Sequence, residues 1–208
     1  MSVSVSPTDA VAIAIMGSGG AGAITAGGLL LEAAGRAGWH GLMTRSVGPQ
    51  IRGGEALAMV RLATAPIGGH GDRFDILLAL DWHNADRFVD ETPLDAGSLI
   101  VADAEAGEPP AAILASGARW VTLPLEQLAK QVPAGRANIV ALGVLARLLA
   151  LPLEPLVTAG RTLASKGLDP AAQCPERRRL VAGQQPAGRG AGNGRRQRPD
   201  RELSLIHI

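Results

Sequence analysis

The chain has little of what several classes of functional site require. It contains one cysteine, Cys174, and no tyrosine among 208 residues. A single cysteine excludes an intramolecular disulfide framework and supplies neither a zinc ligand set nor an iron–sulfur cluster, so we expect a protein of the reducing cytoplasm. Two Phe and three Trp leave few aromatic side chains on which nucleic-acid bases could stack. The sequence also has no Ser/His/Asp set and no metal-ligand spacing, so we predict no catalytic or metal residue of its own.

Targeting signals are missing as well. The apolar stretch from Val11 to Met16 is short, and no basic segment precedes it. A signal peptide needs that basic segment, and a membrane span needs about 20 apolar residues. We therefore expect no membrane partner and interpret the stretch as a buried strand. The length suits one domain with a core of Ala, Leu, Val and Ile.

Apolar runs alternate with helical patterns along residues 11–165. The predicted strands are residues 11–16, 40–44, 55–63, 75–80, 98–102 and 118–123. The predicted helices are residues 20–36, a short one carrying Asp86, Arg87 and Phe88, and residues 125–131, 138–151 and 153–165. This alternation predicts a single α/β domain with a Rossmann-like, mostly parallel sheet flanked by helices. The helix at 138–151 is apolar nearly all round, so we expect it to be buried rather than amphipathic.

Residues 167–208 differ from the rest of the chain. Residues 176–208 carry eight Arg against three acids, whereas residues 1–175 carry twelve Lys and Arg against sixteen acids. Three interpretations compete: a basic tail for nucleic acid or an acidic partner, a solvated linker, or no natural protein sequence. The final LSLIHI resembles the translation of a transposase adapter end, and an Arg/Gly/Pro-rich segment is typical of a GC-rich gene translated in a wrong frame. We expect residues 1–166 to form the domain and residues 167–208 to be frame-shifted or adapter-derived, so no nucleic-acid partner is predicted.

A glycine-rich turn follows the first predicted strand. The stretch GSGGAG satisfies G-x-G-x-x-G, and its glycines are Gly17, Gly19, Gly20 and Gly22. Such a turn lets a phosphate approach the backbone at a helix N-terminus. A dinucleotide site also needs an acidic residue about 20 residues later, but residues 42–46 contain none. Because Arg45 would suit a 2′-phosphate, a free-standing NAD(P)-binding oxidoreductase stays an alternative, beside a purely structural turn.

A second stretch, SVGPQIRGGE at residues 46–55, places an arginine beside glycines. The glycines let the backbone approach a neighbour closely, and the guanidinium of Arg52 is a planar fork of donors for a carboxylate, a phosphate or carbonyl groups. One interpretation is that the stretch from Arg52 to Glu55 reaches a partner domain or an anionic ligand. The other is an internal ion pair of Arg52 with Glu55 or another acid.

Taken together, these stretches resemble the γ subunit or γ domain of the 2-oxoacid:ferredoxin (acceptor) oxidoreductases. In that family a glycine-rich turn precedes a Ser-x-Gly-x-x-x-Arg-Gly-Gly loop, a vRi-type strand and, later, an Asn-x-x-x-Leu-Gly helix. The matching residues are Gly17 to Gly22, then Ser46, Gly48, Arg52, Gly53 and Gly54, then Val60, Arg61 and Leu62, and finally Asn138, Leu142 and Gly143. The resemblance covers about residues 10–165. The GPQIRGG form is most similar to chains in which the γ domain precedes an α portion, and a free-standing γ subunit is the other possibility.

The resemblance implies an assembly that decarboxylates a 2-oxoacid of the pyruvate, 2-oxoglutarate or ketoisovalerate type. Such an assembly uses thiamine diphosphate with Mg, coenzyme A and iron–sulfur clusters, and it passes electrons to ferredoxin. This chain lacks a cysteine set for a cluster and an evident thiamine diphosphate motif, so the resemblance assigns those sites to α and β portions. The chain would then act as scaffold and interface in a hetero-oligomer and would be inactive alone. The predicted interface or ligand residues are Ser46, Arg52, Gly53, Gly54, Glu55 and Asn138.

Overall fold

The computed structural model of the protein describes residues 10–48 and 54–165, with the backbone alone at 162–165. The predicted tail, together with Arg52 and Gly53, lies outside the described residues. The elements are β1 (Val11–Ser18), α1 (Ala23–Arg36), β2 (His40–Val47), β3 (Glu55–Ala63), β4 (Ile76–Ala79), the 3-10 helix η1 (Ala85–Glu91), β5 (Leu99–Asp103), α2 (Ala111–Leu114), β6 (Arg119–Leu123), α3 (Leu125–Lys130), α4 (Ala137–Leu148) and α5 (Leu153–Ser165). Every predicted strand and helix is present, and the four-residue α2 was not predicted.

The strands form one six-stranded sheet in the order β2-β3-β1-β4-β5-β6. The pairs β1–β4, β4–β5 and β5–β6 are parallel, whereas β3 is antiparallel to both β1 and β2. Among the described strands β3 therefore runs against all the others, and the predicted mostly parallel α/β sheet is confirmed. The antiparallel direction of β3 follows from the short connection between β2 and β3. The stretch from Val47 to Glu55 is too short for the crossover of about a dozen residues that a parallel neighbour needs.

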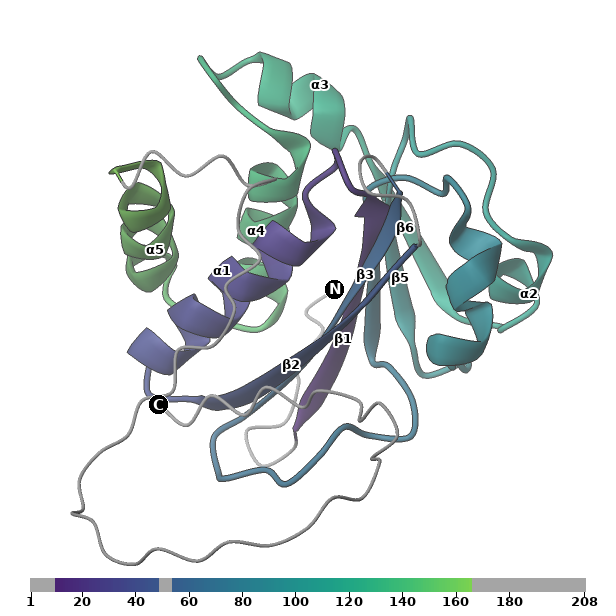
Figure 1. Ribbon diagram of the computed structural model, residues 1–208, viewed down its shortest axis with the longest axis horizontal. Coiled ribbons are helices and arrows are strands. Elements are labelled where there is room, and N and C mark those ends of the chain that lie inside the picture. Colours follow the sequence, from purple (N-terminus) through teal and green to yellow (C-terminus); the bar gives the residue numbers. More distant parts are fainter. Residues whose placement is uncertain (1–9, 49–53, 166–208) are drawn as a thin grey trace, which may run out of the picture.

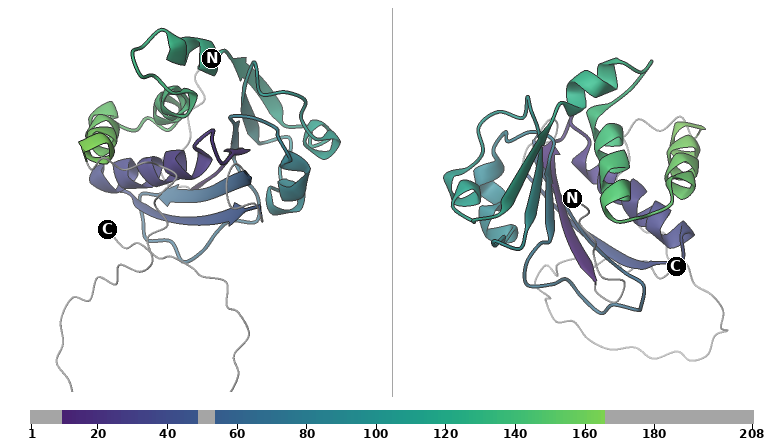
Figure 2. Two further views of the ribbon diagram at one scale, coloured as in Figure 1. Left: turned by 45° about the horizontal axis from the view of Figure 1, so that its top comes forward. Right: turned by 180° about the vertical axis from the view of Figure 1, so that it is seen from behind.

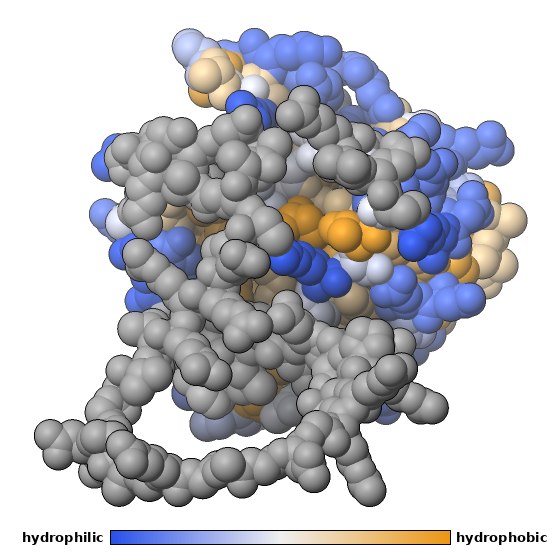
Figure 3. All heavy atoms as spheres, in the orientation of Figure 1, coloured by the Kyte–Doolittle hydropathy of each residue, from blue (hydrophilic) through white to orange (hydrophobic). Residues whose placement is uncertain are grey.

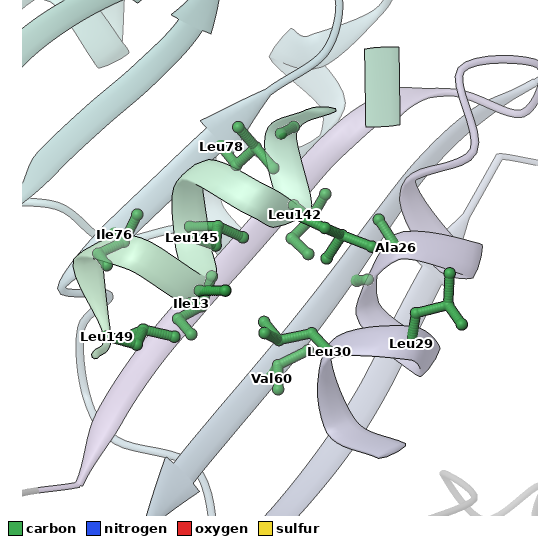
Figure 4. Close-up of a cluster of buried hydrophobic side chains, with 14 of the residues drawn as sticks. Ile13, Ala26, Leu29, Leu30, Val60, Ile76, Leu78, Leu142, Leu145 and Leu149 are labelled. Atoms are coloured by element: carbon green, nitrogen blue, oxygen red, sulfur yellow. The ribbon is translucent and has the colours of Figure 1, made fainter. Parts of the chain in front are cut away.

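Helices cover both faces of the sheet (Figures 1 and 2). The layer of α1, α4 and α5 lies on one face, and α2 lies on the other, together with η1. Alternate residues of each strand point to opposite faces, so each face builds its own hydrophobic cluster. On the α1 face, Leu142 and Leu145 of α4 pack with Ile13 of β1 (Figure 4). On the other face, Phe88 of η1 packs with Met16 and the strands around it.

The predicted burial of the helix at 138–151 is only half right. In α4 the side chain of Leu142 is 1% exposed, but Ile139 is 46% exposed and Arg147 is also on the surface. The helix is therefore buried on one face, although its composition is apolar nearly all round. The reason is its place in an outer layer, where it covers the sheet and no helix or strand of the described chain lies beyond it (Figure 2). In the described part of the chain, no helix has the length and hydropathy to cross a membrane.

The surface carries several large hydrophobic side chains. In the coloured part of Figure 3, hydrophobic residues gather near the centre and hydrophilic residues lie around them. Within residues 10–48 and 54–161, the exposed large hydrophobic residues are Val47, Leu114, Trp120, Val121, Leu128, Val132, Ile139, Leu153 and Val157. Single exposed hydrophobic residues are common in proteins. Trp120 and Val121 differ because they are neighbours on a strand at the edge of the sheet.

The connection between β3 and β4 is fastened to the sheet by two polar contacts. The His70 Nε2 atom lies 2.9 Å from the Thr44 hydroxyl, and the Arg61 guanidinium donates to the Gly69 carbonyl at 2.7 Å. The other ring nitrogen of His70 is buried and has no hydrogen-bond partner among the described residues. Burial lowers the pKa of His70, and the charge of Arg61 lowers it further.

We predict that His70 makes stability fall on acidification. In the unfolded chain its pKa returns to about 6.5, so the unfolded state takes up a proton more readily than the folded state. The stabilising contribution is therefore complete above this pH and decreases as the pH falls from there toward the lower folded pKa. The variant His70→Gln keeps a polar partner for Thr44 but does not titrate. Urea unfolding should show that the unfolding free energy falls less between pH 7 and pH 5 for this variant than for the wild type. An equal fall in both proteins would contradict the prediction.

Candidate functional site

The two predicted loops meet at one edge of the sheet. Ser18 at the end of β1 is paired with Glu55 at the start of β3, and Val47 at the end of β2 is paired with Ala56. The glycine-rich turn after β1 and both ends of the 46–55 loop therefore lie side by side. The Gly19 N–H donates to the Gly54 carbonyl and joins them directly. This is the carboxyl edge of the parallel strands, where ligand sites of α/β folds are found.

Asp81 binds the glycine-rich turn. It follows β4, the strand that lies parallel beside β1. The Ser18 N–H donates to both Asp81 carboxylate oxygens, at 3.0 and 2.9 Å, and the His83 N–H donates to Oδ1 at 3.1 Å. A Cβ on Gly17 would lie only 3.2 Å from the Leu80 Cβ, so the strand-to-turn junction is tight. Sequence reasoning did not place Asp81 in the site. The available signal was an acid directly after a strand, at the edge where the glycine turn also ends.

Gly22 of the glycine-rich turn and Asn138 of the later Asn-x-x-x-Leu-Gly motif are in direct contact. The Asn138 amide donates to the Gly22 carbonyl at 3.3 Å, across 116 residues of sequence, and Asn138 is 5% exposed. Gly22 has a φ of +81°, in the left-handed region that favours glycine. A Cβ on Gly22 would also overlap the Asn138 side-chain nitrogen. The glycine turn and the start of α4 are thus a single packed unit.

Glu55 is a buried carboxylate at the same edge. Its side chain is 7% exposed and lies 3.5 Å from the Arg87 Nε and 3.4 Å from the Asn84 amide nitrogen. The Gly48 N–H donates to the Glu55 carbonyl at 2.9 Å, and a Cβ on Gly48 would overlap the Glu55 carboxylate. Glycine at position 48 is therefore needed for this packing. Within the described residues the ion-pair partner of Glu55 is Arg87, which sequence reasoning did not assign, and Arg52 lies outside those residues.

The structure brings most of the predicted site residues together. Gly17, Gly19, Gly20, Gly22, Gly54, Glu55 and Asn138 belong to the edge just described, whereas Arg52 and Gly53 lie outside the described residues. The Ser46 hydroxyl, near the end of β2, donates to the Glu91 carboxylate at 3.1 Å. His83 is exposed, and its backbone N–H donates to the Asp81 carboxylate.

The chemistry available at this edge is that of positioning and recognition. In the part of the chain that the structure describes, no three His, Cys, Asp or Glu side chains are grouped as metal ligands. The N–H groups of Ser18, Gly19 and Ala21 are used inside the protein, by Asp81, Gly54 and Ser18 respectively. The first turn of α1 has no acidic residue and no side-chain cap at Gly22. Its amides are the groups that a partner or an anion could approach.

Comparison with protein families identifies the chain. The sequence model described as pyruvate ferredoxin/flavodoxin oxidoreductase matches residues 12–175, and the chain belongs to this family. Within the family it is a γ-type domain, as its likeness to solved structures indicates. This supports the resemblance over a free-standing NAD(P)-binding oxidoreductase. A search of curated proteins gave no match.

Three solved structures define the likeness in detail. The 2-oxoglutarate:ferredoxin oxidoreductase from Magnetococcus marinus, solved with 2-oxoglutarate, coenzyme A and succinyl-CoA bound, is 27% identical with a TM-score of 0.65. The match covers 79% of this chain, which spans 29% of the Magnetococcus chain. The γ subunit of a keto/oxoacid ferredoxin oxidoreductase from Geobacter sulfurreducens is 27% identical with a TM-score of 0.58, covering 74% of this chain and 85% of that one. Subunit PORC of pyruvate oxidoreductase from Thermotoga maritima is 18% identical with a TM-score of 0.54, covers 75% and 86%, and supports the fold.

Proposed function

We propose that this chain is the γ component of a 2-oxoacid:ferredoxin oxidoreductase and that it supplies scaffold and interface, not the reacting groups. The complete cytoplasmic assembly would oxidise a 2-oxoacid with loss of carbon dioxide, form an acyl-CoA and pass two electrons toward ferredoxin. The chain's donor set does not fit the inorganic cofactors, since it has one cysteine and its described residues hold no cluster of metal ligands. The sites for thiamine diphosphate, Mg and the iron–sulfur clusters are therefore proposed to lie on α and β portions.

The observation that carries this proposal is the hydrogen-bonded edge formed by the glycine turn, Glu55 and Asn138. Its polar groups are largely satisfied within the domain: Asp81 holds the turn, and Arg87 with Asn84 faces Glu55. A catalytic site would instead be expected to keep polar groups directed at a substrate. An edge whose groups are internally satisfied is suited to present a fixed shape to another protein.

Both ends of the 46–55 loop are anchored to this edge. Gly48 is bonded to the Glu55 carbonyl at the first end, and Gly54 accepts from Gly19 at the second. We propose that Arg52, between these anchors, contacts a partner portion or an anionic ligand such as part of coenzyme A. Glu55 does not need Arg52 for charge balance, because Arg87 is already 3.5 Å away. This favours an external role for Arg52 over an internal pair with Glu55.

We predict that Arg52→Ala weakens assembly without unfolding the domain. Loss of a charged hydrogen bond of about 1.5–3 kcal/mol corresponds to roughly ten- to hundredfold weaker association. The measurement is co-purification of this chain with its α and β portions, followed by 2-oxoacid- and coenzyme A-dependent reduction of ferredoxin. The melting temperature of the isolated chain should stay unchanged.

Arg36→Ala is the matched control, since Arg36 is an exposed arginine at the far end of α1, paired with Glu32 at 2.8 Å. It should leave both assembly and turnover unchanged. A large fall in melting temperature with Arg52→Ala would point to an internal pair. Unchanged assembly and unchanged turnover would overturn the proposed role of the loop.

A further inference from the structure

The 3-10 helix η1 packs on the sheet through one face. Its buried side chains, Ala85 and Phe88, belong to the same hydrophobic cluster as Leu57 of β3. They are three residues apart, and side chains at that spacing in a 3-10 helix lie one above the other. The Thr92 hydroxyl donates to the Phe88 carbonyl at 2.8 Å and fastens the end of the helix. These contacts place η1 against β3, although it follows β4 in the chain.

Polar side chains of η1 contact both described ends of the 46–55 loop. At the first end, the Ser46 hydroxyl donates to the Glu91 carboxylate at 3.1 Å. At the second end, the Glu55 carboxylate lies 3.5 Å from the Arg87 Nε and 3.4 Å from the Asn84 amide nitrogen. Asn84 and Arg87 are again three residues apart, so both face Glu55 from the same side of the helix.

The start of η1 has an unusual backbone conformation. Asn84 precedes the helix with a φ of +54°, in the left-handed region that L-residues other than Asn and Asp seldom adopt. An unfavourable φ of this kind persists where the surrounding structure determines it, and such residues cluster at functional sites. Here the turn accompanies the contact between the Asn84 amide and Glu55. The start of the helix is therefore arranged around the Glu55 carboxylate.

Glu55 connects η1 to the backbone of the loop ends. Its carbonyl accepts from the Gly48 N–H at 2.9 Å, and its carboxylate lies where a Cβ on Gly48 would be. The residue before it, Gly54, accepts from the Gly19 N–H of the glycine turn. A displacement of the Glu55 side chain would therefore disturb both loop ends and their contact with the turn.

We propose that Arg87 is a positioning residue, which acts through the Glu55 carboxylate to hold Gly48 and Gly54 in place at the proposed interface. The inference rests on the proposed function, which supplies the α and β portions as partners. Glu55 is 7% exposed and Arg87 is 50% exposed, so a surface cation neutralises a buried carboxylate. Without this cation the carboxylate is drawn toward water, because a buried charge with no opposite charge is unfavourable. That movement would shift the loop ends.

The first test is amide hydrogen exchange of the full chain, which needs no partner protein. Arg87→Met keeps an apolar stem and removes the charge. The Gly48 amide should then exchange about two- to fivefold faster, as expected for loss of one partly exposed ion pair. The Gly19 amide, bonded to Gly54, should respond in the same direction.

Arg73→Met is the matched control for hydrogen exchange. Arg73 is 47% exposed and lies 3.3 Å from Asp75, in an ion pair at the opposite edge of the sheet. Its loss should leave the exchange of the Gly48 amide unchanged. An equal acceleration in both variants would show that only overall stability is affected, and an unchanged Gly48 rate in Arg87→Met would overturn the positioning role as well.

The second test is a double-mutant cycle on binding of the full chain to its α and β portions. Arg87→Met and Glu55→Gln should each weaken binding by about two- to fivefold, and Arg87→Lys, which keeps the charge, should restore most of the affinity. If Arg87 acts through Glu55, Arg87→Met has no further effect in the Glu55→Gln background. Additive losses would show that Arg87 contacts a partner directly and would overturn the proposal.

Failure of this inference is distinguishable from failure of the proposed function. If Arg52→Ala weakens assembly but Arg87→Met does not, the positioning role is overturned and the proposed interface stands. If the Gly48 amide responds to Arg87→Met while neither variant changes assembly, the positioning of the loop ends is supported and the proposed interface is overturned.

Discussion

Replacing Gly22 by alanine will destabilise the domain by about 2–4 kcal/mol. Two separate effects contribute to this cost. An L-residue in the left-handed region, here a φ of +81°, costs about 1–2 kcal/mol. The added Cβ also overlaps the Asn138 side chain, which is buried and cannot move into solvent without losing its bond to the Gly22 carbonyl. Urea unfolding should show a lower midpoint with an unchanged slope.

A double-mutant cycle with Asn138→Ala separates the two effects. Truncating Asn138 removes the overlap but leaves the unfavourable φ, so the double variant should be more stable than the sum of the single effects by about 0.5–3 kcal/mol. Gly20→Ala is the matched control in the same turn, because a Cβ there would meet no atom within 4 Å. Additive effects, or equal losses at Gly20 and Gly22, would show that the Asn138 contact does not constrain the turn.

The strands and helices were predictable because their signals are local. The β4 strand (ILLA) and the β1 strand are continuous apolar runs, as expected for strands covered on both faces. The antiparallel direction of β3 was less evident, since it depends on the short connection between Val47 and Glu55. The length of that connection was available in the sequence. The four-residue α2 had too few residues for a periodic signal, and its one buried side chain is Ile113.

The site could be predicted only in part. Its glycines were found because each motif marks a turn, and Asn138 was found through the resemblance alone. Arg87 and Asp81 were missed because their contacts are long-range: Arg87 is 32 residues from Glu55, and Asp81 is 63 residues from Ser18. Polar side chains after β4 could be placed near the glycine turn only once β4 was known to lie beside β1. The exposed face of α4 could likewise be predicted only once it was known which layer the helix occupies.

Asp81→Ala should destabilise the domain by about 2–4 kcal/mol, since hydrogen bonds to a charged group contribute about 1.5–3 kcal/mol each. The substitution leaves the Ser18 N–H without its acceptor in a partly buried junction, and the exposed His83 N–H also loses its acceptor. Asp81→Asn retains one acceptor oxygen and should lose about half as much stability. The amide nitrogen that replaces the second oxygen cannot accept a hydrogen bond. Urea unfolding at neutral pH is the measurement.

The matched control is Asp86→Ala, an exposed acid on the adjacent η1 helix, which should change the unfolding free energy by about 0.5 kcal/mol or less. The comparison also tests the coupling of the glycine turn to assembly. Because Asp81 fixes the turn beside Gly54, its loss should weaken binding of the α and β portions, and Asp86→Ala should not. Equal stability of the Asp81→Ala and Asp86→Ala variants would contradict a structural role for the Asp81 carboxylate. Loss of stability with full assembly retained would place the interface away from the turn.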